Sequence, residues 1–308
     1  MSWGELIWFN GKLVKWDEAK IHVMTHSLHY GTSIFEGIRG YATADGKAVA
    51  IFRLKEHMER FEHSAKLIGF KLRYTVDELC EAVVQTVKAN GVSDYYIRPI
   101  GFIGKEEMAL VPSTTELDVA VGVLKWGKFL GKAYYEGAKV TVAGWRKEPQ
   151  DVTPAQAKAG GHYVFSFMTS LQARARGFDE AVVLDHRGFI AEGSGENIFI
   201  VKDGVAYTPP TYAPILIGIT RNSVIELLRN ELGVEVVEKD LTLGDLITAD
   251  EAFFTGTAAE ITPIVEVDGL KIGNGVPGDV TKKLQKLYED IVRGKNSKYG
   301  HWLAVVNP

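Results

Sequence analysis

The chain has 308 residues, 46% of them hydrophobic and 24% charged, with a formal net charge of −4, values typical of a globular protein with one large domain or two of ordinary size. The sequence lacks a cluster of lysine and arginine, a membrane-length apolar run and a signal peptide, so we expect neither nucleic acid nor membrane as a partner. Its single cysteine, Cys80, can form no internal disulfide, which favours a cytoplasmic location.

The first part of the chain predicts a small α+β unit. An Asn-Gly pair at 10–11 between two apolar runs is a strong hairpin signal. Apolar residues recur every three or four positions over 54–68, which predicts a helix with one apolar face. Thr75 and Glu78 form a capping box ahead of a second helix, and Asn-Gly at 90–91 ends it. The strand-like runs that follow are 95–102 and 117–124.

The second part mixes helices and strands without a regular βαβ alternation, which favours an α+β fold over a doubly wound sheet. Glycines spaced through 127–137 indicate a linker. The predicted helices are 163–176, 219–232 and 280–292, and the predicted strands are 181–184, 198–201 and 205–207. We expect a small N-terminal α+β domain over 1–122, an interdomain linker over 123–136 and a large C-terminal domain over 137–308.

Lys158 lies in a segment with little other charge and is followed, after Ala159, by two glycines. An amine is nucleophilic near neutral pH only if its pKa is lowered or it has already condensed with a carbonyl. The glycines would let backbone or a planar ligand come close. On this segment alone, an ordinary solvated lysine at a helix start is the more common situation.

Three turns rich in small residues could bind anions. The turn at 193–195 lies between Glu192 and Glu196 just before a strand, where site residues are often held, although such a sequence is more often a plain tight turn. The segment 218–220 opens a helix, so its amides and Thr220 could bind an anion, or Thr220 could be a simple N-cap. The turn at 256–259 also exposes amides.

Two further patterns bear on ligand binding. Tyr96 and Arg98 share one face of a predicted strand, and an arginine beside a phenol can hold a carboxylate, although a surface ion pair explains the pattern equally well. His22, His26 and His29 recur at helical spacing, but no acidic residue at a matching interval and no nearby cysteine completes a metal site. We expect structural histidines on a strand and a turn, and no metal.

These groups together match the requirements of pyridoxal phosphate. A lysine holds its aldehyde as a Schiff base, and a carboxylate keeps the pyridine nitrogen protonated so that the ring accepts electrons. A phenol can bond the ring oxygen, and turns with an arginine can hold the phosphate.

Six motifs in chain order resemble those of branched-chain amino acid aminotransferases, pyridoxal phosphate enzymes of fold-type IV. They are His-Tyr-Gly-x-x-x-Phe-Glu-Gly-Ile-Arg at 29–39, Tyr-Ile-Arg-Pro at 96–99, Ala-Lys-Ala-Gly-Gly at 157–161, Glu-Gly-Ser-Gly-Glu-Asn at 192–197, Gly-Ile-Thr-Arg at 218–221 and Thr-Gly-Thr-Ala-Ala-Glu-Ile at 255–261. The resemblance covers nearly the whole chain. It implies a two-domain α+β fold like that of D-amino acid aminotransferase, with the cofactor between the domains and Lys158 carried by the large one.

The resemblance also implies cofactor contacts. Lys158 would be the catalytic residue, which forms the Schiff base and moves the substrate proton. Glu192 would pair with the pyridine nitrogen, and Tyr163 would contact the ring oxygen O3′. The remaining cofactor-binding residues would lie at the phosphate: Arg60, Gly195, Ile219, Thr220 and Thr257.

The substrate contacts implied by the resemblance fall into three groups. The α-carboxylate would meet Tyr96, Ala258 and Ala259. The side-chain pocket would be walled by Tyr30, Phe35, Trp126 and Phe129. The distal carboxylate of glutamate would meet Arg98, with Arg39 as a second candidate. The resemblance implies ping-pong transamination of leucine, isoleucine or valine with 2-oxoglutarate. An aromatic box with an arginine at its edge suits both an aliphatic chain and a carboxylate.

Two residues depart from the family pattern, and two alternative functions remain open. His162 stands where asparagine is usual and Phe129 where tyrosine is usual, which affects the substrate range rather than the reaction class. A D-amino acid or (R)-amine transaminase, or an aminodeoxychorismate lyase, would share Lys158 and Glu192 and differ in the pocket. A non-enzymatic pyridoxal phosphate carrier would need only the lysine. The resemblance further implies a homodimer or higher homo-oligomer, since the loop with Tyr30 usually reaches a partner's site.

Overall fold

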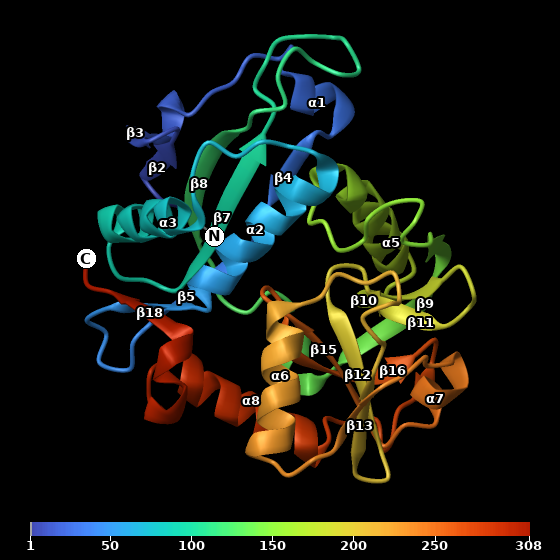
Figure 1. The fold of residues 1–308 in the computed structure, drawn as a ribbon. Helices are drawn as coiled ribbons and strands as arrows, with labels where there is room; N and C mark the ends of the chain where they lie inside the picture. The colour runs from blue at the N-terminus through green and yellow to red at the C-terminus, as the bar shows by residue number, and fades with distance from the viewer. Residues whose placement is uncertain (1) are drawn as a thin grey trace. The chain divides into compact units, whose positions relative to one another are not determined.

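The computed structural model describes residues 2–308, which fold as two compact units (Figure 1). Unit 1 contains the chain up to Gly127 together with Ala157–His162 and Glu289–Pro308. Unit 2 contains Lys128–Gln156 and Tyr163–Tyr288. Over the described residues, no helix has the length and apolar character needed to cross a bilayer.

Unit 1 is built on a sheet whose strands follow the order β18-β6-β5-β7-β8-β2-β3, with β1 paired to β8 and β4 paired to β7. The strands are β1 Ser2–Trp3, β2 Leu6–Phe9, β3 Lys12–Lys15, β4 Ser33–Phe35, β5 Ile38–Ala42, β6 Val49–Phe52, β7 Tyr95–Phe102, β8 Asp118–Lys125 and β18 Leu303–Val306. The α-helices are α1 His26–Tyr30, α2 Leu54–Ile68 and α3 Val76–Asn90, and the 3-10 helices are η1 Trp16–Glu18, η2 Gly160–His162 and η3 Ser297–Trp302.

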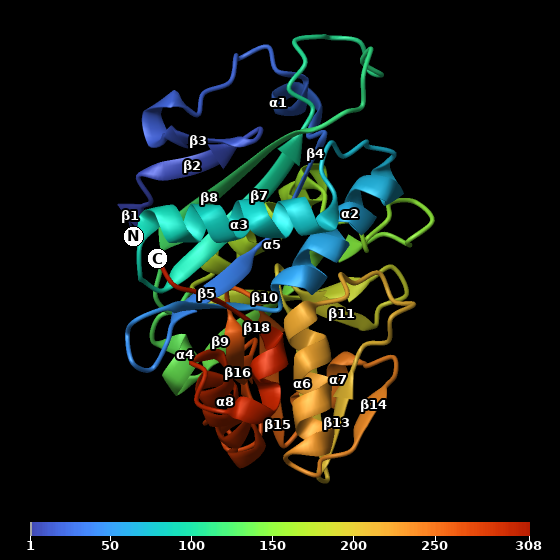
Figure 2. The same ribbon diagram turned by 60° about the vertical axis from the view of Figure 1, so that its left-hand side comes forward.

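Local signals in the sequence explain several of these elements. Asn10 and Gly11 have positive φ values of 45° and 91° and close the β2–β3 hairpin, as predicted. Glu78 N donates to the Thr75 hydroxyl at 3.3 Å, which confirms the capping box of α3. Helices α2 and α3 pack against each other and against the sheet (Figure 2). The core they share includes Met58, Phe61, Leu79, Val83, Val87, Ile97 and Val121.

Unit 2 contains a second sheet in the order β11-β10-β9-β16-β15-β12-β13-β14, with β17 paired to β16. The strands are β9 Ala138–Lys147, β10 Glu180–Asp185, β11 Ile190–Gly193, β12 Asn197–Lys202, β13 Val205–Thr208, β14 Val236–Glu238, β15 Glu251–Gly256, β16 Glu260–Val267 and β17 Leu270–Lys271. The helices are α4 Ala133–Glu136, α5 Tyr163–Ala175, α6 Ile219–Asn230, α7 Leu243–Ile247 and α8 Asp279–Val292, whose last residues count with unit 1.

Small side chains let α5 lie close to the sheet of unit 2. Ala173 of α5 packs with Ala143, Ala181 and Val183 of β9 and β10. A larger core lies among the central strands and includes Ile198, Ile200, Phe254 and Ile264. The unit therefore holds the ends of β11, β12 and β15 in a rigid frame.

The contacts divide the chain differently from the expected domains. The boundary falls after Gly127, and α4 and β9 begin within or directly after the region predicted to be a linker. Two later segments count with unit 1, because β18 pairs with β6 and because Ala159 bridges Ile34. Lys158 therefore belongs to unit 1, whereas the sequence prediction placed it in the C-terminal domain.

The interpretation of the N-terminal histidines as lying on a strand was wrong. Residues 26–30 form α1, and Gly31 ends it in the left-handed conformation with a φ of 65°. His26 hydrogen-bonds through Nδ1 to the Thr32 hydroxyl at 2.8 Å and through Nε2 to Ala109 O at 3.0 Å. His29 Nε2 lies 3.0 Å from Val23 O. These hydrogen bonds give His26 and His29 structural roles.

Candidate active site

The main chain around Lys158 is fixed on both sides in unit 1. Phe35 N donates to Lys158 O at 3.0 Å, so the segment 157–162 lies along β4. Lys158 N donates to the Ser64 hydroxyl of α2 at 3.0 Å, and that hydroxyl donates to Arg60 O at 2.8 Å. The lysine is therefore held through its backbone before any side-chain contact is considered.

The glycines after Lys158 serve backbone packing. A Cβ on Gly160 would lie 2.2 Å from the Ser33 hydroxyl of β4, so a larger residue there would force that side chain to move. Gly161 N also donates to Gly31 O at 3.2 Å. The close approach suggested by the sequence is that of two backbone segments.

A buried carboxylate, Glu36, organises the cations next to Lys158. Arg60 donates to it as a fork, with Nε to Oε1 at 2.7 Å and Nη2 to Oε2 at 2.9 Å. His57 Nδ1 lies 2.7 Å from Oε2. Burial alone would raise the pKa of Glu36, but Arg60 and His57 hold that pKa well below its usual range. Since burial also lowers the pKa of His57, the neutral imidazole donates to an ionised carboxylate.

The environment of Lys158 favours the neutral amine. Burial lowers its pKa from 10.5 to about 8, and the positive charges of Arg60 and Arg98 act in the same direction. Glu36 and Tyr96 oppose this shift. A substantial fraction of the side chain is therefore an unprotonated nucleophile slightly above neutral pH.

Tyr96 and Arg98 project from the same face of β7, as the sequence predicted. Arg98 Nη2 donates to the Tyr96 hydroxyl at 2.9 Å, and the guanidinium lies 4.5 Å from the Phe35 ring centroid. Lys158 Nζ lies 4.9 Å from the same centroid, and the Trp126 ring is 5.0 Å from that of Tyr96. The buried Nε of Arg98 has no hydrogen-bond partner within residues 2–308. This N–H could donate a hydrogen bond to a bound ligand.

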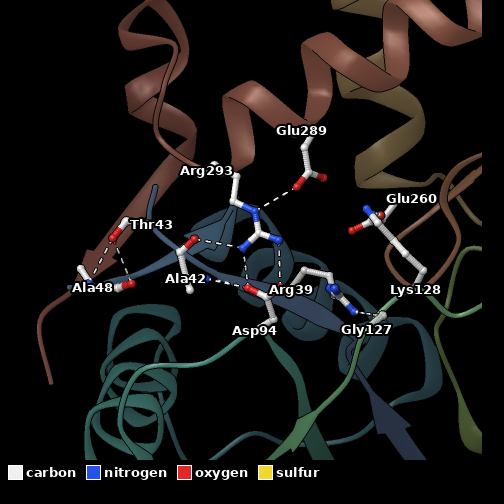
Figure 3. Close-up of polar contacts among 10 residues, drawn as sticks. All are labelled: Arg39, Ala42, Thr43, Ala48, Asp94, Gly127, Lys128, Glu260, Glu289 and Arg293. Carbon is white, nitrogen blue, oxygen red and sulfur yellow. Dashed lines mark hydrogen bonds and ion pairs between the residues drawn. The ribbon is translucent and has the colours of Figure 1, made fainter. Parts of the chain in front are cut away.

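Arg39 and Tyr30 are engaged elsewhere in unit 1. Arg39 is 3% exposed, stacks on Tyr41 at 5.1 Å and donates from Nη1 to Gly127 O at 3.1 Å (Figure 3). Tyr30 is 41% exposed, and its hydroxyl donates to Met108 O at 2.8 Å.

In unit 2, Glu192 on β11 is a buried carboxylate with several donors. Lys147 of β9 forms an ion pair with Oε1, while Leu216 N donates to Oε2 at 3.1 Å. Asn197 Nδ2 lies 3.3 Å from Oε2 and also donates to Leu216 O at 2.8 Å. These donors hold the carboxylate in a fixed orientation at the end of the strand.

The three turns that the sequence analysis identified as possible anion-binding sites lie near Glu192. Gly218 is the N-cap of α6, and no described side chain caps that helix, so the amides of its first turn face outward. A Cβ on Gly218 would lie 2.1 Å from Asn197 Oδ1, which explains why the position is glycine. The turn after β15 is adjacent, because Asn197 pairs with Thr255 and Gly256 lies next to Gly195.

This arrangement brings together five of the predicted cofactor-binding residues in unit 2. They are Glu192, Gly195, Ile219, Thr220 and Thr257. Thr220 is the second residue of α6, so the interpretation of Thr220 as a simple N-cap was wrong. Tyr163 is the first residue of α5, and Phe129 lies in the loop ahead of α4.

The turn holding Ala258 and Ala259 is closed by an unusual residue. Glu260 has a φ of 54°, the left-handed region that costs a non-glycine residue about 1–3 kcal/mol. Its carboxylate is 1% exposed and forms an ion pair with Lys128, both of which Figure 3 shows. The Thr262 hydroxyl donates to Ala259 O at 2.8 Å. These contacts offset the strain and fix the turn.

Sequence reasoning missed four functional side chains. Glu36, His57 and Ser64 organise the surroundings of Lys158, and Lys147 pairs with Glu192. Glu36 lies within the motif at 29–39, but the sequence analysis assigned it no role. The signal that could have identified it is a carboxylate that follows two apolar residues and precedes a glycine. The others are long-range partners with no local signature.

The residues present fit pyridoxal phosphate. Lys158 supplies a neutral amine for an aldehyde, and Glu192 supplies an oriented carboxylate for a protonated ring nitrogen. The uncapped start of α6 supplies donors for a phosphate. The orphaned Nε of Arg98 supplies a donor for a substrate carboxylate.

Comparison with known proteins places the chain in a family. Residues 33–267 match the family described as Amino-transferase class IV. The chain is 44% identical over 305 residues to the branched-chain-amino-acid aminotransferase of Escherichia coli (strain K12), covering 98% of each sequence.

Solved structures agree in fold as well as sequence. The branched-chain aminotransferase from Thermoproteus uzoniensis with norvaline has a TM-score of 0.93 and 46% identity, covering 98% of this chain and 99% of that one. A T.th. branched-chain amino acid aminotransferase complexed with N-(5'-phosphopyridoxyl)-L-glutamate has a TM-score of 0.91 and 43% identity, covering 98% of each. The predicted α+β, fold-type IV architecture is confirmed. The family match and these relatives show that the chain belongs to the branched-chain amino acid aminotransferases of class IV.

Proposed function

We propose that this protein transfers amino groups between L-leucine, L-isoleucine or L-valine and 2-oxoglutarate, with pyridoxal phosphate as its cofactor, in a ping-pong reaction. The observation that carries the proposal is the amine of Lys158, whose pKa burial lowers to about 8. The names of its relatives support the substrate class, and the phosphopyridoxyl-glutamate complex of the T.th. enzyme supports both the cofactor and the second amino acid.

The cofactor contacts that we propose are those implied by the family resemblance. Lys158 would bind its aldehyde carbon, Glu192 its ring nitrogen and Tyr163 its O3′ oxygen. The phosphate would meet the predicted anion-binding groups: Arg60, Gly195, Ile219, Thr220 and Thr257. The bound ring supplies an electron sink for the pair released when the substrate Cα–H bond breaks.

Lys158 then moves the proton. The unprotonated fraction of Nζ can accept a proton from the substrate Cα, and the resulting ammonium can return it to a neighbouring carbon. Arg60 and Arg98 favour the form that accepts, while Glu36 and Tyr96 stabilise the ammonium that results. The balance of these charges keeps the pKa near the working pH, which suits a group that must act as both base and acid.

The substrate would be oriented by its carboxylates. Tyr96 and the turn with Ala258 and Ala259 would receive the α-carboxylate, and Arg98 would bind the distal carboxylate of glutamate through its buried, unpartnered Nε. The aliphatic substrates would meet the aromatic residues Tyr30, Phe35, Trp126 and Phe129. Arg39 already donates to Gly127 O, so we propose it only as a second candidate, after Arg98, for binding the distal carboxylate.

The deciding experiment separates this function from its neighbours in fold-type IV. Purified protein is mixed with L-leucine, D-alanine or (R)-1-phenylethylamine, and formation of the 2-oxo acid or ketone is followed with 2-oxoglutarate as acceptor. We expect turnover with L-leucine and its loss in Lys158→Ala. Conversion of only the D or R substrates, or retained turnover in Lys158→Ala, would overturn the proposal.

We also propose a homo-oligomer in the cytoplasm. Helix α5 exposes Val164, Phe167 and Leu171 at 60%, 64% and 55%, and their spacing places them on one face. Such an apolar stripe is typical of a surface that another protein covers. Sedimentation equilibrium should give at least twice the mass of 34.0 kDa, and a monomer at micromolar concentration would contradict this assignment.

A further inference from the structure

We propose that Ser64 is a positioning residue for Lys158, whose main chain its buried hydroxyl holds against α2. The inference rests on the proposed role of Lys158 and adds a residue to which neither the motifs nor the resemblance assigned a function. Ser64 is 0% exposed and lies 94 residues before the lysine in sequence.

The hydroxyl is oriented by two hydrogen bonds. A serine hydroxyl has one proton to donate and lone pairs that accept. The proton goes to Arg60 O at 2.8 Å, one turn earlier in α2. The lone pairs then face the Lys158 N–H, which donates at 3.0 Å. Only the second of these two bonds leaves the helix, and it links the lysine segment to α2.

The same face of α2 also sets the electrostatics of the lysine. Residues three or four apart share a helix face, which places His57, Arg60 and Ser64 together. Arg60 is held by the fork with Glu36 and lowers the pKa of Lys158. The face therefore carries both the charges that tune the amine and the acceptor that fixes its backbone.

Removing the acceptor should change Lys158 more than the helix. In Ser64→Ala the Lys158 N–H loses this acceptor, while Phe35 N still donates to Lys158 O. The amine can then move away from Arg60 and Arg98, so its pKa should rise toward 10.5. A misplaced base slows proton transfer with little effect on substrate binding.

Thr86 offers a matched control on α3. It is 0% exposed, and its hydroxyl donates to Ala82 O at 2.7 Å, the same local bond that Ser64 makes to Arg60. Thr86→Val and Ser64→Ala each delete one buried hydroxyl and nearly conserve shape. The difference between the two variants is the bond to the Lys158 segment.

The primary test is hydrogen–deuterium exchange of the full-length holoenzyme, read by mass spectrometry in overlapping peptides that end at and after Lys158. We expect the Lys158 amide to exchange about three- to ten-fold faster in Ser64→Ala, the effect of losing one hydrogen bond. Exchange in peptides covering 54–68 should be unchanged, and Thr86→Val should match wild type at Lys158.

Two further readouts accompany exchange. In Ser64→Ala, kcat for L-leucine should fall roughly ten-fold or more while KM stays within about two-fold, and the pH midpoint of the bound cofactor's absorbance should move relative to wild type. Ser64→Thr keeps a hydroxyl and should restore wild-type exchange at Lys158. Ser64→Cys, which replaces the hydroxyl with a weakly accepting thiol, is the test variant if Ser64→Ala does not fold, and the same faster exchange at Lys158 is expected.

The proposal is overturned if Lys158 exchanges equally in Ser64→Ala and Thr86→Val, or if faster exchange spreads throughout 54–68, which would make Ser64 a structural residue of α2 alone. Failure of the proposed function looks different, because Lys158→Ala would then retain transamination. The exchange measurement decides the Ser64 contact in either case.

Discussion

Replacing Lys158 should stabilise the cofactor-free protein, and the structure supplies the magnitude. The pKa falls from 10.5 to about 8, a difference of about 2.5 units. At about 1.4 kcal/mol per unit this corresponds to roughly 3 kcal/mol of unfavourable free energy in the folded, protonated state. Because the residue is partly exposed, water reduces the penalty, and we expect about 2–3 kcal/mol.

The pH dependence follows from the sign of the shift. Between pH 8 and 10.5 the unfolded chain binds more protons than the folded chain, so the free energy of unfolding of the wild type rises with pH across this window. Below pH 8 the penalty is fully present, and above 10.5 it is gone. Lys158→Met keeps the length and apolar stem but carries no charge, so its advantage should be full at pH 7 and shrink as pH rises.

Urea denaturation of cofactor-free wild type and Lys158→Met at about pH 7 and 9.5 measures the effect. Lys283→Met is the matched control, because Lys283 is exposed on α8 and its removal should shift stability little at either pH. A difference between wild type and Lys158→Met that is the same at both pH values, or a destabilised variant at pH 7, would refute the reasoning.

Three other substitutions test separate parts of the site. Glu36→Gln breaks the fork with Arg60 in a fully buried position and should lower the free energy of unfolding by about 3 kcal/mol. Glu116→Gln, in the exposed pair with Arg73, should change that free energy little. Equal effects of the two variants would argue against a stabilising role for the buried Glu36 carboxylate. Arg98→Leu should raise KM for 2-oxoglutarate roughly 30-fold and leave KM for L-leucine within about three-fold, because only the acceptor carries a distal carboxylate; parallel changes in steady-state kinetics would contradict that assignment. Gly218→Ala places a Cβ 2.1 Å from Asn197 Oδ1, so it should destabilise the protein by about 1–3 kcal/mol in urea denaturation and speed release of the cofactor. Gly300→Ala, with no atom within 4 Å of the new Cβ, should change neither measurement.

Local signals in the sequence predicted local structure well. The Asn-Gly hairpin at 10–11, the capping box of Thr75 and Glu78 and the alternation that joins Tyr96 to Arg98 all depend on neighbours within a few residues. Each is a statement about one turn or one strand. The structure confirms all three.

The missed features depend on partners far apart in the chain. Strand β9 was not predicted, and it pairs in parallel with β10 and β16 on either side. Glu36 meets Arg60 across 24 residues, and Lys147 meets Glu192 across 45. No periodicity encodes such pairings, so the residues that tune Lys158 and Glu192 could not be assigned from the sequence. The family resemblance supplied the reacting groups but not their supports.

The pairing of β18 with β6 has a consequence for the way the protein is made. The sheet of unit 1 gains an edge strand from residues 303–306, and Arg293 ties the same region to Asp94 with bonds of 2.6 and 2.8 Å (Figure 3). During synthesis the sheet of unit 1 therefore cannot be completed until a segment more than two hundred residues later in the chain has been made. Such non-local closure slows folding and leaves β6 without one of its two neighbouring strands on the ribosome. A nascent chain ending before residue 300 should therefore depend on chaperones.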